Sequence, residues 1–148
     1  MEVGSLADRY NAASEETRRL VNRLLDQDAA DQAWAGQLGP VYRQGDVAGL
    51  LGKTKQAVSG DRRLLRLELR SGTIGYPAFQ FDGRQQTPGL GAIVELLLPV
   101  VETSWTIASW LTSPQTDLDD ARPLDLLRSG HAVDAYAAAR RFAHGLAG

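Results

Sequence analysis

Near the start of the chain, apolar residues recur at the spacing of one helix face. The pattern predicts an amphipathic helix over 14–30, capped by Ser14, with an apolar stripe formed by Leu20, Val21, Leu24 and Leu25. The helix must bury this stripe against its own domain or against a second copy of the chain. Both arrangements stay open, since proteins that bind palindromic DNA are usually dimers.

Residues 44–63 carry the spacing of a helix-turn-helix. Val47, Leu51 and Val58 are apolar where the two helices would face each other, and Ala48 is small at their point of approach. Gly52 suits the turn, because a positive φ costs little at glycine. Lys53 and Asp61 depart from the pattern, since both are charged at positions that are commonly apolar.

The second helix of this motif carries side chains suited to a DNA groove. Thr54 can cap the helix, and short polar and basic groups near its start match base edges and phosphates. The predicted DNA-contacting residues of this segment are Thr54, Lys55, Gln56, Ser59, Arg62 and Arg63.

A β-hairpin is predicted directly after the motif. Alternating apolar residues over 65–70 and 73–77 flank the pair Ser71-Gly72. A hairpin in this place is typical of a wing, and Arg70 at its turn could reach a phosphate. The alternative is a small hairpin that only covers the core.

The remaining pattern is helical. Residues 85–89 read as a linker, and they precede helices expected over 90–98, over 104–111, from Pro123 to a cap at Gly130, and over 133–146. The predicted fold is mainly α, a helix-turn-helix with a small hairpin wing followed by a small helical domain. The expected divisions are an N-terminal helical segment over 1–38, a DNA-binding module over 39–86 and a helical domain over 87–148.

Charge is distributed unevenly along the chain. The formal net charge is −2, yet residues 41–84 hold eight basic and four acidic side chains, a surplus of +4. The segments on either side, 1–40 and 85–148, each hold four basic and seven acidic residues, or −3 each. The positive charge therefore coincides with the helix-turn-helix, which favours contact with phosphates.

Catalytic and metal-binding patterns are scarce. The chain has no cysteine and only two histidines, which excludes disulfides and makes a zinc site implausible. We expect no enzyme, no cofactor and no metal. The apolar run over 92–101 is too short to cross a bilayer, so no membrane partner and a cytoplasmic location are expected.

The C-terminal third resembles a known family. The corner Trp110-Leu111-x-x-Pro114, the segment Pro123-Leu-Asp-Leu-Leu127, the glycine at 130 and the alanine-rich helix that follows resemble the toxin-binding domain of the Xre/MbcA/ParS antitoxins. The resemblance covers about residues 90–146. It implies a type II antitoxin that binds a RES-domain toxin acting on NAD, blocks the cleft of that toxin and represses its own operon.

The surface residues near the last two helices are the candidates for toxin contact. They are Arg128, His131, Arg140, Arg141 and His144. Arginine is favoured at interfaces, and a cationic helix could occupy a cleft built for an anionic dinucleotide. The residues expected to form the core of this part are Trp105, Trp110, Leu111, Leu118, Leu124 and Leu127. The chief alternative is a stand-alone winged helix-turn-helix regulator, and a weaker one is a partition protein.

Overall fold

The computed structural model describes residues 9, 12, 14–23 and 38–147. The chain divides into two units, residues 1–37 and residues 38–148. In the first unit, residues 15–23 are helical, and Oγ of Ser14 accepts a hydrogen bond from the backbone N–H of Thr17 at 3.2 Å. Ser14 therefore caps this helix, as predicted. Residues 24–30 of the predicted helix, with Leu24 and Leu25, lie outside the described residues.

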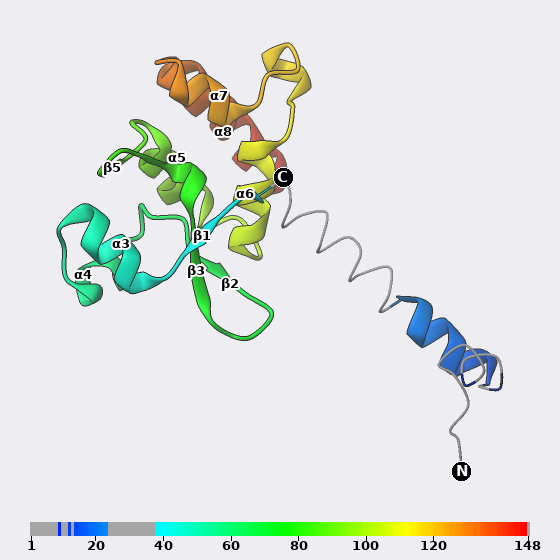
Figure 1. Cartoon of the computed structure of the whole chain (residues 1–148). Helices are drawn as coiled ribbons and strands as arrows, with labels where there is room; N and C mark the ends of the chain where they lie inside the picture. The colour runs from blue at the N-terminus through cyan, green and yellow to red at the C-terminus, as the bar shows by residue number, and fades with distance from the viewer. Residues whose placement is uncertain (1–8, 10–11, 13, 24–37, 148) are drawn as a thin grey trace. The chain divides into compact units, whose positions relative to one another are not determined.

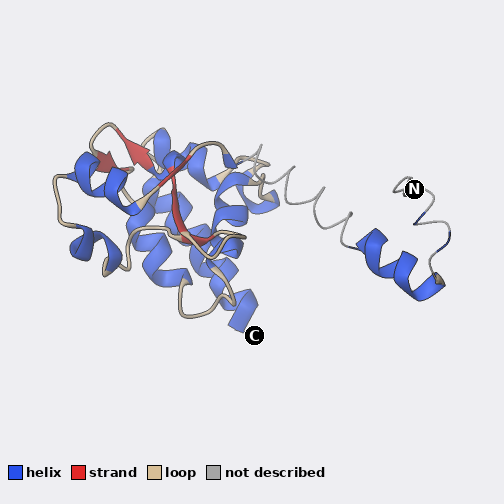
Figure 2. Ribbon diagram, turned by 60° about the horizontal axis from the view of Figure 1, so that its bottom comes forward, coloured by secondary structure: helices blue, strands red, loops and turns tan. Residues whose placement is uncertain are grey.

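The second unit is mainly helical, with short antiparallel strands (Figures 1 and 2). Its helices are α3 (Gln44–Leu51), α4 (Lys55–Ser59), α5 (Leu90–Leu97), α6 (Ser104–Thr112), α7 (Pro123–Arg128) and α8 (Ala132–Ala147), with 3-10 turns η1 (Ala78–Gln80) and η2 (Thr116–Leu118). Its strands are β1 (Val41–Tyr42), β2 (Leu67–Glu68), β3 (Ile74–Pro77), β4 (Phe81–Asp82) and β5 (Gln85–Gln86). The four helices expected in the C-terminal part of the chain all form in this unit, each within two residues of the expected ends.

A three-stranded antiparallel sheet of order β1-β3-β2 joins one strand that precedes the α3–α4 pair to two strands that follow it. The predicted hairpin is confirmed, with Leu67 opposite Gly75 and Glu68 opposite Ile74. The sequence did not indicate β1, which pairs Val41 with Pro77 on the other edge of β3. Gly75 allows this crossing, because a Cβ at that position would overlap Cγ1 of Val41.

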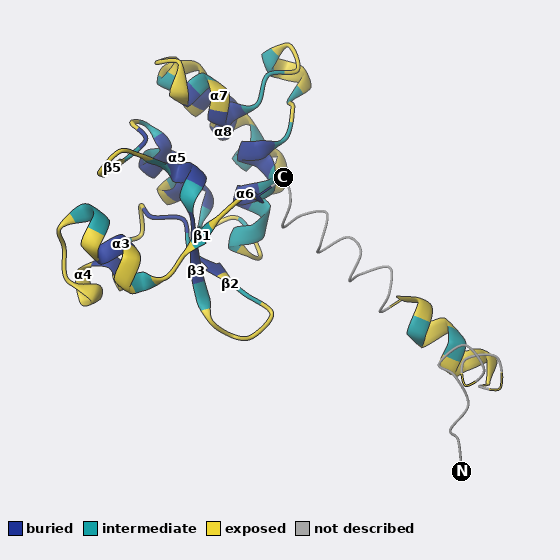
Figure 3. Ribbon diagram, in the orientation of Figure 1, coloured by how far each residue is buried: buried dark blue, intermediate teal, exposed yellow. Residues whose placement is uncertain are grey.

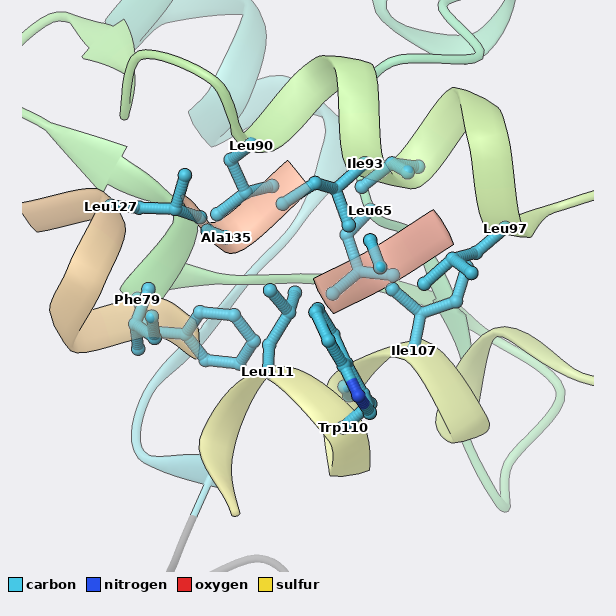
Figure 4. Packing of buried hydrophobic residues seen from close by; sticks show 14 of the residues in the cluster. Leu65, Phe79, Leu90, Ile93, Leu97, Ile107, Trp110, Leu111, Leu127 and Ala135 are labelled. Atoms are coloured by element: carbon cyan, nitrogen blue, oxygen red, sulfur yellow. The ribbon is translucent and has the colours of Figure 1, made fainter. Parts of the chain in front are cut away.

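The main core lies among α5, α6, α7 and α8. In Figure 4 the side chains of Leu90, Ile93 and Leu97 from α5 point toward Ile107 and Leu111 from α6. All five are fully buried. The ring of Trp110, also on α6, stacks on Phe142 of α8, with ring centroids 5.5 Å apart. Of the predicted core residues, Trp105 and Leu118 are only partly buried, and the other four are buried.

Alanine forms the buried face of α8. Ala135, Ala138 and Ala139 are at most 1% exposed, whereas Val133 is 83% exposed. The small side chains let α8 approach α5 closely, and the two helices start side by side: a Cβ on Gly89 would lie 2.7 Å from Cβ of Ala132. Val133, although bulky and apolar, lies on the opposite, exposed side of the helix and outside the core.

One core joins the parts expected to be separate domains. Leu65, Leu67 and Phe79 belong to the same buried cluster as the helices after residue 87. The expected linker over 85–89 is wrong in its first half, since Gln85 and Gln86 form β5 and pair with β4. Thr87 is also buried, at 3% exposed. Backbone hydrogen bonds of Gln85, Gln86 and Thr87 to β4 and Gln80 hold this segment in the unit.

Candidate nucleic-acid interface

The two short helices α3 and α4 enclose a small core of their own. Val47 and Val58 are fully buried and Ala48 is 8% exposed, and Leu64 and Tyr76 complete the cluster. Gly52 ends α3 at φ 65°, the left-handed conformation expected of it, and its N–H donates to the carbonyl of Ala48. The apolar spacing and the turn glycine predicted for this pair are both found.

The backbone of α4 is held at both ends. At its start, Oγ1 of Thr54 accepts a hydrogen bond from the N–H of Ala57 at 3.1 Å, so Thr54 caps α4 as predicted. There, too, Nε2 of Gln44 donates to the carbonyl of Lys55 at 2.6 Å. At its end, Nη1 of Arg66 donates to the carbonyl of Ser59 at 3.0 Å. These contacts fix a helix of five residues that would be unstable alone.

The seven residues predicted to contact DNA are all exposed, and they are Thr54, Lys55, Gln56, Ser59, Arg62, Arg63 and Arg70. Figure 3 shows α4 exposed along most of its surface. Two of the side chains lie against glycines of neighbouring helices. A Cβ on Gly45 would be 3.4 Å from Cε of Lys55, and a Cβ on Gly91 would be 2.9 Å from Nε of Arg63. Lys55 thus lies along the start of α3, and Arg63 turns toward α5.

The two charged residues that depart from the usual motif are paired with each other. Nζ of Lys53 lies 3.9 Å from Oδ2 of Asp61. Oδ1 of Asp61 also accepts from the N–H of Arg63 at 2.9 Å. The pair is partly exposed, so its contribution to stability is small. Its geometry explains why charge is tolerated at both positions.

Tyr76 closes the small core from β3. It is 1% exposed, and this burial raises the pKa of its hydroxyl above 10. Arg66 opposes the shift and Asp61 adds to it. The phenol therefore loses its proton less readily than a free tyrosine, and its side chain is part of the small core of the α3–α4 pair.

The loop of the β2–β3 hairpin places Arg70 at an exposed position. Gly72 takes a φ of 85°, and its N–H donates to the carbonyl of Leu69 at 2.8 Å. The base of the hairpin is tied to α6, because Nε1 of Trp105 donates to the carbonyl of Glu68 at 3.0 Å. A helix of the main core therefore holds the strand that leads to Arg70.

A buried glutamine that sequence reasoning missed holds the chain leaving α4. Gln80 is fully buried, and its Nε2 donates to the carbonyl of Leu65 while its Oε1 accepts from the N–H of Leu65, both at 2.8 Å. Gln86 adds a 3.2 Å bond to Oε1 of Gln80 and a 2.6 Å bond to the carbonyl of Arg63. The isolated glutamine between two phenylalanines gave no sequence signal, because its partners are distant along the chain.

Three of the five residues predicted to bind a toxin are brought together. Arg140, Arg141 and His144 line an open hollow of about 480 Å³ on α8, together with Ala137. Nε of Arg141 is ion-paired with Oδ2 of Asp117 at 2.9 Å. The hollow lies in the C-terminal half of the helix, and the carboxylate of Asp117 offsets one of its two guanidinium charges.

The other two predicted residues lie elsewhere. Nη2 of Arg128, on α7, donates to the carbonyl of Phe79 at 3.3 Å. Nδ1 of His131 lies 3.2 Å from Oγ of Ser129, just before α8 begins. His131 and His144 are separated by thirteen residues, about 20 Å along a helix. The structure therefore does not bring all five residues into one site.

Ionisable groups elsewhere form local pairs. Arg122 and Asp125 make two hydrogen bonds of 2.8 Å, and this pairing lowers the pKa of Asp125. In the part of the chain that the structure describes, no group of histidine, aspartate and glutamate residues could hold a metal ion. Across the same residues, none of the helices combines the length and apolar character needed to cross a membrane.

Comparison with known proteins gives one structural neighbour of note. No family model and no curated protein matches the chain. The NMR structure of Rv2175c matches with a TM-score of 0.56 and 27% sequence identity, over 74% of this chain and 82% of that chain. The two proteins therefore have a similar fold over most of their lengths.

Proposed function

We propose that this protein is a DNA-binding regulator that uses α3 and α4 as a helix-turn-helix and the β2–β3 hairpin as a wing. The observation that carries the proposal is the α3–α4 pair itself. It has its own buried core, a left-handed glycine at the turn and a capped second helix whose outer side chains are exposed. Motifs of this form place the second helix in the major groove.

The charge of this region supports DNA as the partner. Eight basic and four acidic residues lie in 41–84, against a net charge of −2 for the whole chain. Gln56 and Ser59 carry short polar groups that suit base edges, whereas Lys55 and Arg62 carry charges that suit phosphates. Arg70 on the wing suits a phosphate beside the groove.

A binding selection tests the proposal. The full chain would be incubated with duplexes of randomised sequence, and the retained DNA would be sequenced over several rounds. We expect enrichment of one motif, bound with an affinity that falls steeply as salt rises. A pool that stays random, with no salt-sensitive retention, would contradict the proposal.

A second candidate function is that of an antitoxin, and the hollow on α8 favours it. Two guanidinium groups and an imidazole gather there around Ala137, as a surface for an acidic protein partner would require. We propose on this ground that the C-terminal helices could bind a RES-domain toxin that consumes NAD. The shared core described above makes the regulator the better supported function, since the helices after residue 87 also build the DNA-binding part.

Co-expression distinguishes the two functions. A neighbouring reading frame would be induced alone and then with this chain, while growth and cellular NAD are followed. An antitoxin restores both, and the Arg140→Ala/Arg141→Ala variant should lose the rescue. A harmless neighbour, or rescue by that variant equal to the wild type, would remove the antitoxin function and leave the regulator in place.

We also propose that the protein acts as a homodimer, since most helix-turn-helix proteins bind paired half-sites. Leu20 on the N-terminal helix is 50% exposed and offers apolar surface for a second copy. Sedimentation of the free protein tests this proposal. A dimer that the Leu20→Asp variant converts to a monomer is expected, and a wild type that is monomeric alone and on DNA would contradict it.

A further inference from the structure

The β4–β5 hairpin is fastened to the start of α3. Phe81, the first residue of β4, packs against the small core of the α3–α4 pair. Its ring lies 6.1 Å from that of Tyr42, centroid to centroid. Tyr42 immediately precedes Arg43, the N-cap of α3. The hairpin therefore cannot move independently of the first helix of the motif.

The other strand of the hairpin is fastened to the chain leaving α4. Nε2 of Gln86 donates to the carbonyl of Arg63 at 2.6 Å, four residues after α4 ends. The N–H of Thr87 donates to the carbonyl of Gln80 at 2.8 Å, which secures the exit from β5. The hairpin thus bridges the beginning of one helix and the end of the other.

The tip of the hairpin is a tight turn that presents Arg84. Phe81 pairs with Gln86 and Asp82 with Gln85, which leaves only Gly83 and Arg84 between the strands. Gly83 takes a φ of 62°, as the first position of a two-residue hairpin turn requires. Arg84 is exposed, and it makes no ion pair or side-chain hydrogen bond within the described part of the chain.

The hairpin and the wing approach the motif from different directions. In Figure 1 the β4–β5 hairpin and the loop between β2 and β3 lie on different sides of the α3–α4 pair. A duplex whose groove receives α4 has phosphates on both sides of that groove. A guanidinium on a short, fixed turn suits such a phosphate, because it can donate two hydrogen bonds at once.

We propose that the β4–β5 hairpin is a second DNA-contacting element, in which Arg84 binds a backbone phosphate on the side of the groove away from the wing. The inference rests on the proposed DNA-binding function and adds to it a residue and an element. A phosphate contact positions the protein without reading bases, so Arg84 contributes affinity rather than sequence preference. Asp82, beside it on the hairpin, weakens the contact by its negative charge.

Opposite charge changes on this hairpin test the inference. The probe is the duplex recovered by the binding selection, titrated with the full-length wild type, Arg84→Gln and Asp82→Asn. Arg84→Gln should weaken binding about 3- to 10-fold and lower the slope of log affinity against log salt by about 1. Asp82→Asn should strengthen binding about 2-fold by removing a charge that the phosphates repel.

Matched variants control for the change in net charge. Arg140→Gln and Asp134→Asn make the same changes on α8, and they should alter affinity much less than the hairpin variants do. If the hairpin variants change affinity no more than these controls do, the inference about Arg84 is wrong. The proposed DNA-binding function would still stand in that case, because the wild type binds the duplex. A wild type that binds no duplex would overturn both. Unchanged thermal melting of Arg84→Gln verifies that the variant is folded.

Discussion

The side-chain amide of Gln80 pairs with the backbone amide of Leu65 through two 2.8 Å hydrogen bonds, in the manner of two strands of a sheet. Both residues are fully buried. Leu65 lies in the chain between α4 and the β2–β3 hairpin, and its side chain belongs to the main core. A single glutamine thus connects the chain leaving α4 to the main core.

Replacing Gln80 by leucine should destabilise the fold. The change leaves the N–H and the carbonyl of Leu65 buried without partners, at a cost of about 2–4 kcal/mol in the free energy of unfolding. Urea denaturation of the variant measures this cost. Gln85→Leu, on the exposed side of β5, is the control and should change stability by less than about 0.5 kcal/mol. If Gln80→Leu lowers the free energy of unfolding as little as Gln85→Leu does, the hydrogen bonds between Gln80 and Leu65 do not stabilise the fold.

Gly75 and Val41 should show compensation. A Cβ at residue 75 would overlap Cγ1 of Val41 and lie 3.1 Å from Cδ1 of Leu69, so Gly75→Ala should cost about 1–3 kcal/mol. The same change in a Val41→Ala background should cost clearly less, and a double-mutant cycle measures the difference. If Gly75→Ala lowers the free energy of unfolding equally in both backgrounds, contact with Val41 is not the reason for the loss.

Gly49 supplies the matched control for that cycle. It lies within α3, it is exposed, and a Cβ there would meet nothing within 4 Å. Gly49→Ala should therefore stabilise the protein by about 0.5–1 kcal/mol through helix propensity. A loss of stability in this variant would show that alanine disturbs the protein for reasons unrelated to the space beside Val41.

Tyr76 should make stability fall at alkaline pH. Burial raises the pKa of its hydroxyl above 10, so the unfolded chain releases this proton at a lower pH than the folded protein does. The contribution of neutral Tyr76 is therefore complete below pH 10 and is lost as pH rises through the folded-state pKa. Urea midpoints measured at increasing pH above 9 would follow the loss.

Tyr76→Phe should flatten this alkaline decline, because phenylalanine has no proton to release. Tyr136→Phe is the control, since Tyr136 is 37% exposed on α8. A decline that persists unchanged in Tyr76→Phe, or that Tyr136→Phe removes instead, would assign the alkaline sensitivity to another group.

Local chemistry explains what the sequence predicts correctly. Gly52, Thr54 and the spacing of Val47 and Val58 act through neighbours within a few residues, and the structure has them as expected. The hairpin around Ser71-Gly72 follows from the same kind of local signal. Wherever a turn residue or a periodic apolar face determines an element, the sequence is sufficient.

Contacts between distant residues explain what the sequence does not predict. Gln80 and Gln86 are polar residues whose hydrogen bonds to Leu65 and Arg63 form only when the chain leaving α4 lies beside them. In α8, alanines form the core while Val133 is exposed, because the close approach of α5 leaves no room for larger side chains. Neither feature has a local pattern, and both determine how the helices after residue 87 pack against the rest of the unit.

Binding of DNA by α4 and its flanking charges, as proposed, can be tested by a salt titration of charge-reversal variants. Fluorescence anisotropy of the selected duplex would be measured for the wild type, for Lys55→Glu/Arg62→Glu and for Arg140→Glu/Arg141→Glu. The two variants carry the same change in net charge, on α4 and the residues after it in one and on α8 in the other. Circular dichroism verifies that each variant remains folded.

We expect Lys55→Glu/Arg62→Glu to lose affinity on the order of 100-fold or more, whereas the α8 variant should lose far less. The wild type should also lose affinity steeply as salt rises, in proportion to the phosphates it neutralises. If Lys55→Glu/Arg62→Glu instead binds with wild-type affinity and the same salt dependence, α4 does not contact DNA and the helix-turn-helix function is wrong.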